Sequence, residues 1–270
     1  MDPIDTDWLL AELRAALATH ARPRFLQLDP GDVSEKSAPD DLVTAADLAI
    51  EAALTQAIRA RHPEVEVIGE EAVATEPARL DRLSEAERAV ILDPIDGTWN
   101  FVHGLPAWGA ILAVVERGET VWGGLVDGLT GHLMAARRGA GLAPARRFDR
   151  PFRPGDLVGY LPMGLLPAGL RPACAALIPR LGRVQSLRCS CHEYRLVASG
   201  AADWVLGWAL KPWDHAAGAL AVAEAGGVAR CLDGRPYGPT VRHGPLLSAR
   251  TPEIWEHVAA LLRPVLAPEA

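Results

Sequence analysis

Apolar residues recur every three or four positions along two N-terminal segments, residues 5–21 and 44–61. This spacing places them on one face of an amphipathic helix, so both segments are predicted to be helices. Pro23 and Pro63 follow the two segments, and a helix is expected to end before a proline. The N-terminal part of the chain is therefore predicted to carry two helices that each bury one face.

The connection between these helices carries polar residues that could belong to a site. Residues 29–41 are rich in Pro, Gly and Ser, which predicts a loop, and Lys36 lies within it. Thr44 and Asp47 match a helix capping box at the start of the second helix. Capping alone explains both residues, and a role in a site is the alternative.

Two short apolar runs, residues 65–68 and 89–92, predict buried strands that end in carboxylates. Glu70 and Glu71 follow the first run. Neighbouring side chains on an extended backbone point to opposite sides, so only one of the two is expected to face a given site directly. Residues 72–88 are polar and are predicted to be a surface excursion between the two strands.

Asp93 and Asp96 follow the second run and are held by Pro94 in a stiff turn. Two carboxylates this close repel each other unless a cation lies between them, and oxygen ligands suit a hard ion such as Mg²⁺. Gly97 and Thr98 offer backbone N–H groups where a helix can begin, a place that favours phosphate. An ordinary turn followed by a helix cap is the alternative explanation.

In the remainder of the chain, the pattern of predicted elements changes from strands joined by short turns to alternating strands and helices. Runs at 107–116, 120–126 and 132–137, joined by short glycine-bearing turns, predict an antiparallel meander. The basic, turn-rich residues 139–154 predict a joint between subdomains 1–150 and 151–270. Beyond the joint, strands and helices alternate, which predicts a layered α/β half. Strands are expected at 157–161, 183–187, 203–210, 228–232 and 246–249, and helices at 172–181, 191–198, 213–225 and 252–262.

A third acidic position opens one of these helices. Asp214 lies in its first turn, beside Trp213, and the next residues are small, so another element can pack closely against them. An aspartate after a proline at a helix start is also an ordinary cap. From these residues alone, a cap and a site residue both remain open for Asp214.

Composition limits the classes of partner. The chain has 270 residues, 49% of them hydrophobic, and a net charge of −7, which argues against nucleic acid or an anionic membrane as the main partner. An acidic protein that handles phosphate would need metal ions to offset repulsion. Because no signal peptide or membrane-spanning run is recognised, a cytoplasmic location is expected. The four cysteines contain no Cys-x-x-Cys pair, and reduced thiols are expected.

Motifs of several other enzyme classes are absent from the sequence. It contains no Gly-x-Ser-x-Gly elbow, no Gly-x-x-x-x-Gly-Lys-Ser/Thr loop and no His-Glu-x-x-His. Hydrolase-triad, nucleotide-kinase and zinc-protease functions therefore lack support.

The acidic segments together resemble the successive motifs of the inositol monophosphatase family, and their order and separations match over nearly the whole chain. In chain order they are Lys36 with Asp41-Leu42-Val43-Thr44-x-x-Asp47, Gly69-Glu70-Glu71, Asp93-Pro94-Ile95-Asp96-Gly97-Thr98-x-Asn100-Phe101, and Trp213-Asp214-x-Ala216-Ala217-Gly218.

This resemblance implies a fold and an assembly. The fold would be α+β, with alternating α/β/α/β/α layers as in inositol monophosphatase and fructose bisphosphatase. An antiparallel sheet would lie in the N-terminal half and a mixed sheet in the C-terminal half. The N-terminal subdomain would carry most metal ligands, and the C-terminal one would carry Asp214 and the wall beside the substrate. A lithium-sensitive homodimer is implied as well.

The resemblance also implies a metal-dependent phosphatase that binds two to three Mg²⁺ ions. Glu70, Asp93 and the backbone carbonyl of Ile95 would bind one ion. Asp93, Asp96 and Asp214 would bind a second, and a third, weaker ion would lie beside Glu70.

The resemblance assigns the remaining site residues to water and phosphate. Thr98 and Asp47 would orient and deprotonate the attacking water, and Glu70 would act with them through its metal ions. The N–H groups of Gly97 and Thr98 would hold phosphate oxygens. Glu71 would support the ligands from behind, and Lys36 would be a peripheral basic group.

The substrate-side residues depart from the family pattern. Arg188-Cys189-Ser190-Cys191 stands where relatives have Gly-Ser/Thr-Ala-Ala, and Gly207 stands where many have a polyol-binding glutamate. Arg188 and Lys211 are candidate cations facing the substrate, with surface salt bridges as the alternative, and Glu193 could face an amine.

The acidic set and these departures leave three hypotheses for the function. A small hydroxylated phosphate ester, similar to inositol 1-phosphate, is the expected substrate. Because residues 210–214 also resemble relatives that hydrolyse histidinol phosphate, that substrate, or a sugar or nucleotide phosphate, is the alternative. A non-catalytic binding protein on the same fold is the third possibility.

Overall fold

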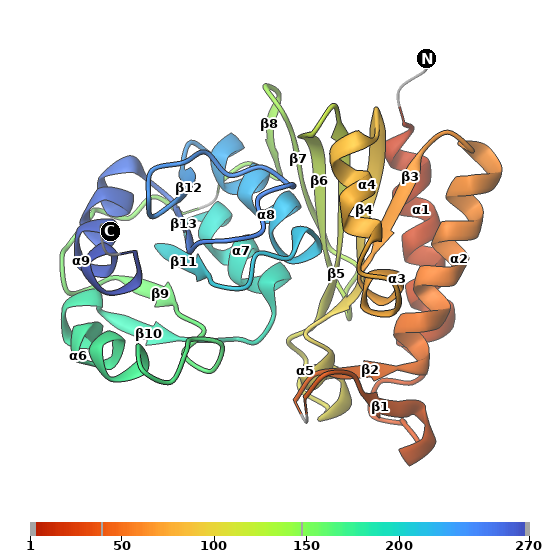
Figure 1. The fold of residues 1–270 in the computed structure, drawn as a ribbon, viewed down its shortest axis with the longest axis horizontal. Coiled ribbons are helices and arrows are strands. Elements are labelled where there is room, and N and C mark those ends of the chain that lie inside the picture. The colour runs from red at the N-terminus through yellow and green to blue at the C-terminus, as the bar shows by residue number, and fades with distance from the viewer. Residues whose placement is uncertain (1–3, 39, 147, 268–270) are drawn as a thin grey trace.

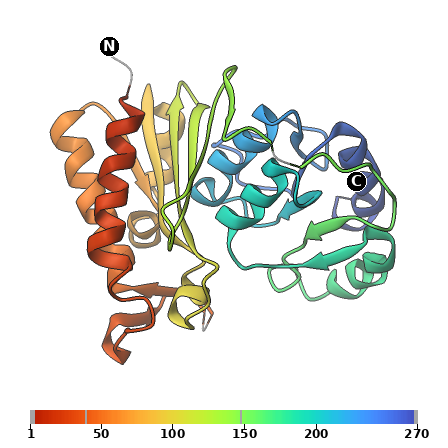
Figure 2. The ribbon, with the colours of Figure 1, turned by 180° about the vertical axis from the view of Figure 1, so that it is seen from behind.

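The computed structural model describes residues 4–38, 40–146 and 148–267. Helices and sheets alternate in five layers: a helix pair, a six-stranded sheet, a second helix pair, a five-stranded sheet and a third helix pair (Figure 1). The reverse view shows the first helix pair covering the outer face of the six-stranded sheet (Figure 2). The expected α/β/α/β/α layering is confirmed.

Two long helices form the first layer, as the apolar periodicity predicts. Helix α1 spans Thr6–Ala16 and continues as a π-helical turn over Leu17–Ala21, and helix α2 spans Ala45–Arg61. Their apolar stripes are buried against each other and against the sheet. The capping box at the start of α2 is present, with Thr44 as the N-cap.

The six-stranded sheet is antiparallel except for its first pair, β3 and β4, which run parallel. A parallel pair needs a crossover connection, and here it contains two short helices, α3 (Glu70–Thr75) and α4 (Arg79–Glu85). The expected surface excursion over residues 72–88 lies mostly at the surface and contains regular structure that the sequence analysis does not predict. The strands in spatial order are β3 Glu66–Gly69, β4 Arg88–Asp96, β5 Gly109–Glu116, β6 Glu119–Asp127, β7 Leu133–Arg137 and β8 Gly141–Ala143.

The expected loop over residues 29–41 contains regular structure. A 3₁₀ turn over Pro30–Asp32 leads into β1 (Val33–Glu35), which pairs antiparallel with β2 (Leu42–Thr44). These strands are too short to show an alternating apolar pattern, which explains why they escape prediction. The turn between them carries Lys36.

The C-terminal half holds the mixed sheet and four helices. Two of its strand pairs are parallel and two are antiparallel, which confirms the expected mixed sheet. The strands in spatial order are β10 Arg183–Gln185, β9 Val158–Tyr160, β11 Trp204–Gly207, β13 Leu246–Ala249 and β12 Val228–Cys231. The helices are α6 Arg171–Leu181, α7 Ser190–Ser199, α8 Pro212–Glu224 and α9 Pro252–Leu266.

The small residues of α8 let it lie directly on the six-stranded sheet. A Cβ atom at Gly123 on β6 would approach the Cα atom of Ala217 on α8 to 2.7 Å. Close approach of this kind requires small residues on both sides. Helix α8 therefore joins the two sheets and brings its first turn, with Asp214, to the end of β4.

Several element boundaries differ from the sequence prediction. Helix α9 continues through Pro264 to Leu266, β11 ends at Gly207, and β8 lies inside the predicted joint. All four cysteines are free and buried. Among the described residues, no helix has the length and apolar character needed to cross a membrane.

Candidate active site

The site is built on an irregularity near the end of β4. Asp93 pairs with Ile111 and Asp96 with Gly109 on the neighbouring strand, so β4 has one extra residue between these pairs. In a regular strand, side chains three positions apart point to opposite faces. The extra residue forms a bulge, which re-aims side chains, and it brings both carboxylates to the same side. Proline, which cannot donate a ladder hydrogen bond, is tolerated at such a position.

Asp214, in the first turn of α8, completes a cluster of three acids with Asp93 and Asp96. One carboxylate oxygen from each residue lies within 4.8 Å of the other two. Burial, together with the neighbouring acids, raises the pKa of Asp93 well above its usual value. Its Oδ1 atom is buried and has no hydrogen-bond partner among the described residues. An unpartnered buried oxygen among converging carboxylates fits a hard divalent cation.

Asp96 also holds the start of α7. Its carboxylate accepts hydrogen bonds from the backbone N–H groups of Ser190 and Cys191 and from the thiol of Cys189, at 3.2, 2.5 and 3.0 Å. Burial raises the pKa of Asp96 to about 6, although these hydrogen bonds oppose the shift. The two halves of the chain are therefore joined through one of the expected metal ligands.

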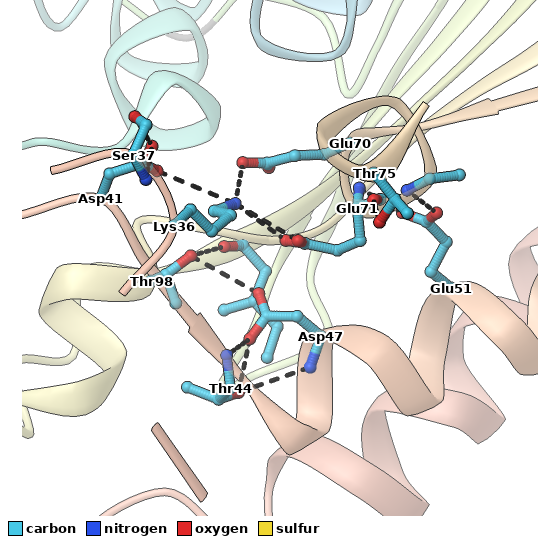
Figure 3. Close-up of polar contacts among 12 residues, drawn as sticks. Lys36, Ser37, Asp41, Thr44, Asp47, Glu51, Glu70, Glu71, Thr75 and Thr98 are labelled. Carbon is cyan, nitrogen blue, oxygen red and sulfur yellow. Dashed lines mark hydrogen bonds and ion pairs between the residues drawn. The ribbon is translucent and has the colours of Figure 1, made fainter. Parts of the chain in front are cut away.

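Asp47 and Thr98 lie side by side (Figure 3), and the charge of Asp47 acts on Asp93 of the cluster. Thr98 Oγ1 lies 3.5 Å from Asp47 Oδ1 and donates a hydrogen bond to the carbonyl of Ile95 at 2.9 Å. The other Asp47 oxygen accepts hydrogen bonds from the N–H and hydroxyl of Thr44. Burial raises the pKa of Asp47 to about 7. Capping and a role at the site are thus compatible, because each uses a different oxygen.

Thr98 opens a short helix, α5 (Thr98–Val102), and the residue before it must be glycine. Gly97 has a φ of 84°, in the left-handed region that favours glycine. A Cβ atom there would also lie 3.0 Å from the carbonyl oxygen of Ala107. The turn that ends β4 thus presents the Gly97 and Thr98 backbone beside the acids.

Lys36 reaches the site from the β1–β2 turn and contacts both acids of α3 (Figure 3). Its ammonium lies 2.7 Å from Glu70 Oε1 and 3.1 Å from Glu71 Oε1. Burial would lower the pKa of Lys36, but the two carboxylates outweigh it and raise the pKa. Burial, together with the charge of Glu70, raises the pKa of Glu71 to about 8.

The premise of the prediction that only one of these two acids faces a given site does not hold. It assumes that the strand continues past Gly69, whereas α3 begins at Glu70. Successive side chains on a helix are separated by about 100° rather than 180°. Both acids therefore reach the same ammonium group.

Glu51, which holds the start of α3, is absent from the residues predicted for the site. This buried residue on α2 accepts hydrogen bonds from the N–H groups of Glu71 and Ala72 at 2.9 and 2.7 Å. The sequence does contain a pattern that could have identified Glu51. This glutamate lies one turn after Asp47, on the buried stripe of α2 that also carries Ile50 and Leu54. A glutamate on a buried stripe needs polar partners.

The two candidate substrate-side cations have different surroundings. The guanidinium of Arg188 lies over the ring of Trp99, 4.4 Å from its centroid, and 3.6 Å from a carboxylate oxygen of Asp40. Its backbone φ is 52°, an uncommon value for arginine. The pKa of Lys211 is raised, because the charges of Asp214 and other acids outweigh the effect of burial.

Glu193 and Gly207 serve packing in the C-terminal half rather than an open substrate surface. Glu193 is 7% exposed, and its carboxylate accepts hydrogen bonds from the hydroxyl of Ser186 and the N–H of Leu187. A Cβ atom at Gly207 would lie 2.7 Å from the ring of His215, so that ring occupies the space where a larger side chain would extend. Contrary to the expectation from the sequence, Glu193 and Gly207 therefore do not line an open substrate surface.

Comparisons with known proteins agree with this geometry. The model of the inositol monophosphatase family matches residues 9–148 and 168–267. An inositol-1-monophosphatase of Mycobacterium leprae is 32% identical over 206 residues, covering 73% of this chain and 70% of the relative. The Nus factor SuhB of Pasteurella multocida is 30% identical over 241 residues, covering 85% of each chain.

A solved structure supports the same fold. An IMPase/NADP phosphatase complexed with Mg²⁺ and phosphate superposes with a TM-score of 0.77 at 21% identity, covering 95% of this chain and 94% of that one. The family match spans most of the sequence, and two relatives of at least 30% identity are covered over more than two thirds of their length. The chain therefore belongs to the inositol monophosphatase family and is a phosphatase, a phosphoric monoester hydrolase.

Proposed function

We propose that the protein is a Mg²⁺-dependent phosphomonoesterase that hydrolyses a small hydroxylated phosphate ester, similar to inositol 1-phosphate, by attack of water. The observation that carries this proposal is the convergence of Asp93, Asp96 and Asp214, with one oxygen of each within 4.8 Å of the others, beside the Thr98 and Asp47 pair. Phosphoryl transfer depends mainly on positioning and charge neutralisation, and this arrangement can provide both.

Two to three Mg²⁺ ions are proposed to bind these acids. Asp93, Asp96 and Asp214 would hold one ion, and Glu70, Asp93 and the Ile95 carbonyl would hold another, with a third ion near Glu70. When bound, Mg²⁺ neutralises phosphate charge and lowers the pKa of water. The related IMPase/NADP phosphatase, which was solved as a complex with Mg²⁺ and phosphate, supports this choice of metal.

The chain's own groups would orient the water and the phosphate. Thr98 would turn its hydroxyl from the Ile95 carbonyl to Asp47 Oδ1, pass its proton to Asp47 and take up one proton from the attacking water, so that Asp47 acts as the general base. This use fits the pKa of Asp47, which burial raises to about 7, because a general base works best near the operating pH. The N–H groups of Gly97 and Thr98 would hold phosphate oxygens. Lys36, which contacts both Glu70 and Glu71, would help to hold Glu70 in place together with Glu71.

Arg188 and Lys211 are the proposed contacts for the part of the substrate beyond the phosphate. Among the described residues, the guanidinium of Arg188 contacts the ring of Trp99 and makes only a long contact with Asp40, so it retains free donors. Lys211, whose charge acts on Asp214, disfavours a positively charged amine at this place. This favours an ester similar to inositol phosphate over histidinol phosphate, whose amine carries a positive charge.

A substrate panel with Mg²⁺ tests the proposal. It should contain inositol 1-phosphate, histidinol phosphate, fructose 1,6-bisphosphate and adenosine 3′,5′-bisphosphate, with released phosphate as the readout. We expect the largest kcat/KM for inositol 1-phosphate or a similar polyol ester. Hydrolysis confined to histidinol phosphate would refute the proposed substrate, and Mg²⁺ binding without hydrolysis of any ester would refute the proposed activity.

We also propose a homodimer and inhibition by lithium. Both are properties that the resemblance to the inositol monophosphatase family implies. Sedimentation should give about twice the chain mass of 28.8 kDa, and a monomer would contradict the first proposal. Unchanged turnover at millimolar lithium would contradict the second.

A further inference from the structure

The carboxylate of Glu51 links helix α2 to the first turn of α3. Its Oε2 atom accepts the N–H of Glu71 at 2.9 Å, and its Oε1 atom accepts the N–H of Ala72 at 2.7 Å. N–H groups in the first turn of a helix have no carbonyl partner within that helix. Each oxygen of Glu51 therefore satisfies one otherwise unpaired donor (Figure 3). The residue is 6% exposed.

The glycine before Glu70 makes room for this carboxylate. A Cβ atom at Gly69 would lie 2.2 Å from the carboxyl carbon of Glu51, which is too close for any side chain. The backbone of Gly69, at φ −96° and ψ 151°, is extended and open to every residue type. Space for Glu51, and not backbone conformation, therefore accounts for glycine at position 69.

Keeping Glu51 ionised at this place is costly. Burial raises its pKa, and the nearby charge of Glu70 adds to that shift, while the two backbone hydrogen bonds oppose it. A neutral cap such as serine or threonine would satisfy a helix start without adding another acid beside Glu70 and Glu71. Glu51 lies on α2 one turn after Asp47, so its carboxylate connects the helix that carries Asp47 to the start of α3.

We propose that Glu51 is a positioning residue for the metal centre, holding the first turn of α3 so that Glu70 is presented to its metal ion at a fixed distance from Asp47. This inference rests on the proposed function, in which Glu70 binds Mg²⁺. Helix α2 carries Asp47 directly and Glu70 through Glu51. One rigid helix thereby sets the relative placement of the base and of a metal ligand.

Glu51→Gln tests the proposal, because an amide has a single acceptor oxygen and leaves one of the two N–H groups unpaired. The readout is the dissociation constant for Mg²⁺, measured by calorimetry on the full chain without substrate. We expect it to rise about tenfold, the lower end of what loss of a group supporting a metal ligand causes. The Mg²⁺ concentration for half-maximal phosphate release should rise by the same factor.

Thr251→Ala is the matched control. It removes the side-chain cap of α9, where Thr251 Oγ1 accepts the N–H of Ile254 at 3.3 Å. It should lower thermal stability as the loss of a helix cap does and leave Mg²⁺ affinity within twofold of wild type. A merely structural role for Glu51 would make the two variants behave alike.

Gly69→Ala provides an independent route to the same defect. Its backbone tolerates alanine, so the change acts through displacement of the Glu51 carboxylate and should also weaken Mg²⁺ binding about tenfold. In a Glu51→Ala background the clash is relieved, and Gly69→Ala should then add less than twofold. Should Glu51→Gln fail to fold, Glu51→Asp retains two acceptor oxygens on a shorter side chain and should show a smaller loss in the same direction.

Mg²⁺ affinity within twofold of wild type for both Glu51→Gln and Gly69→Ala would overturn the inference, as would independent, multiplicative effects in the double variant. This failure is distinct from failure of the proposed function. A wild-type protein that binds Mg²⁺ but hydrolyses no ester would refute the activity. The ratio of the Mg²⁺ dissociation constants of Glu51→Gln and wild type would still decide the role of Glu51.

Discussion

The ammonium group of Lys36 lies 2.7 Å from Glu70 Oε1, between the turn that joins β1 to β2 and the first residue of α3. It also contacts Glu71, so one cation serves two adjacent acids. A metal ion bound by Glu70 would bring a second positive charge to the same carboxylate. Lys36 and that ion are therefore both expected to neutralise the Glu70 carboxylate, so that one can partly replace the other.

Lys36→Met removes the cation and leaves two close carboxylates. Without metal, the variant should unfold about 1–3 kcal/mol more easily than wild type, the cost of leaving buried polar groups unpaired. Mg²⁺ should then raise its melting temperature by more than it raises that of wild type. Arg117→Met, which removes an exposed pair with Glu87 at 2.8 Å, is the control and should show neither effect. Equal Mg²⁺ stabilisation of wild type and Lys36→Met would contradict the prediction.

Asp93→Asn should stabilise the metal-free protein while removing its activity. The Asp93 carboxylate is buried among acids that raise its pKa, and Oδ1 has no partner among the described residues. A neutral amide removes the repulsion, so unfolding in EDTA should become about 1–3 kcal/mol harder. Asp149→Asn, at an exposed site, controls for the loss of one charge. A metal-free variant less stable than wild type would show that the cluster is not under electrostatic strain.

Stability should depend on pH through Glu193. Its pKa is raised by burial from 4.5 to about 8, so between these values the folded protein binds more protons than the unfolded chain. The contribution of neutral Glu193 to the free energy of unfolding is therefore fully present below a pH of about 4.5. It is lost as the pH rises towards 8, by up to about 1.4 kcal/mol per pH unit.

Glu193→Gln isolates this contribution, because its amide oxygen can still accept the hydrogen bonds from Ser186 and Leu187. Denaturant unfolding of metal-free protein should show the variant gaining stability over wild type as the pH increases across this window. Glu85→Gln, at an exposed position of α4, is the comparison. A stability difference that stays constant with pH would contradict burial of an ionisable group at residue 193.

Thr98 and Asp47 are predicted to act as one unit. Thr98→Val and Asp47→Asn should each lower kcat by about 10²–10⁴, the usual contribution of general base catalysis. Because both changes interrupt the same proton path, the double variant should be little slower than either single variant. Thr98→Ser keeps the hydroxyl and should retain most activity. Multiplication of the two losses in the double variant would show that the residues act separately.

The long periodic elements of this fold follow from local patterning. Helix α2 is recognisable from its apolar stripe, and β4 from an apolar run that ends in Asp93. The bulge that unites Asp93 and Asp96 depends on pairing with β5, which a local pattern does not contain. Helix α3 escapes prediction because its six residues are too few for a periodic signal.

The substrate side is harder to predict because its contacts join distant parts of the chain. Asp96 receives N–H groups from residues 94 and 95 positions away. Gly207 is explained by the ring of His215, and nothing in the local sequence links the two. Family motifs identify the acids around the phosphate, whereas these long-range contacts decide which neighbouring positions are packed and which remain open.

The most direct test of the proposed activity measures phosphate release by wild type and Asp93→Asn, each with and without Mg²⁺, on the best ester of the panel. Asp93 is chosen because, unlike Asp96, it does not also hold the start of α7. We predict release only in the sample that contains wild type and Mg²⁺. Equal release in all four samples would contradict a metal-dependent phosphatase centred on Asp93.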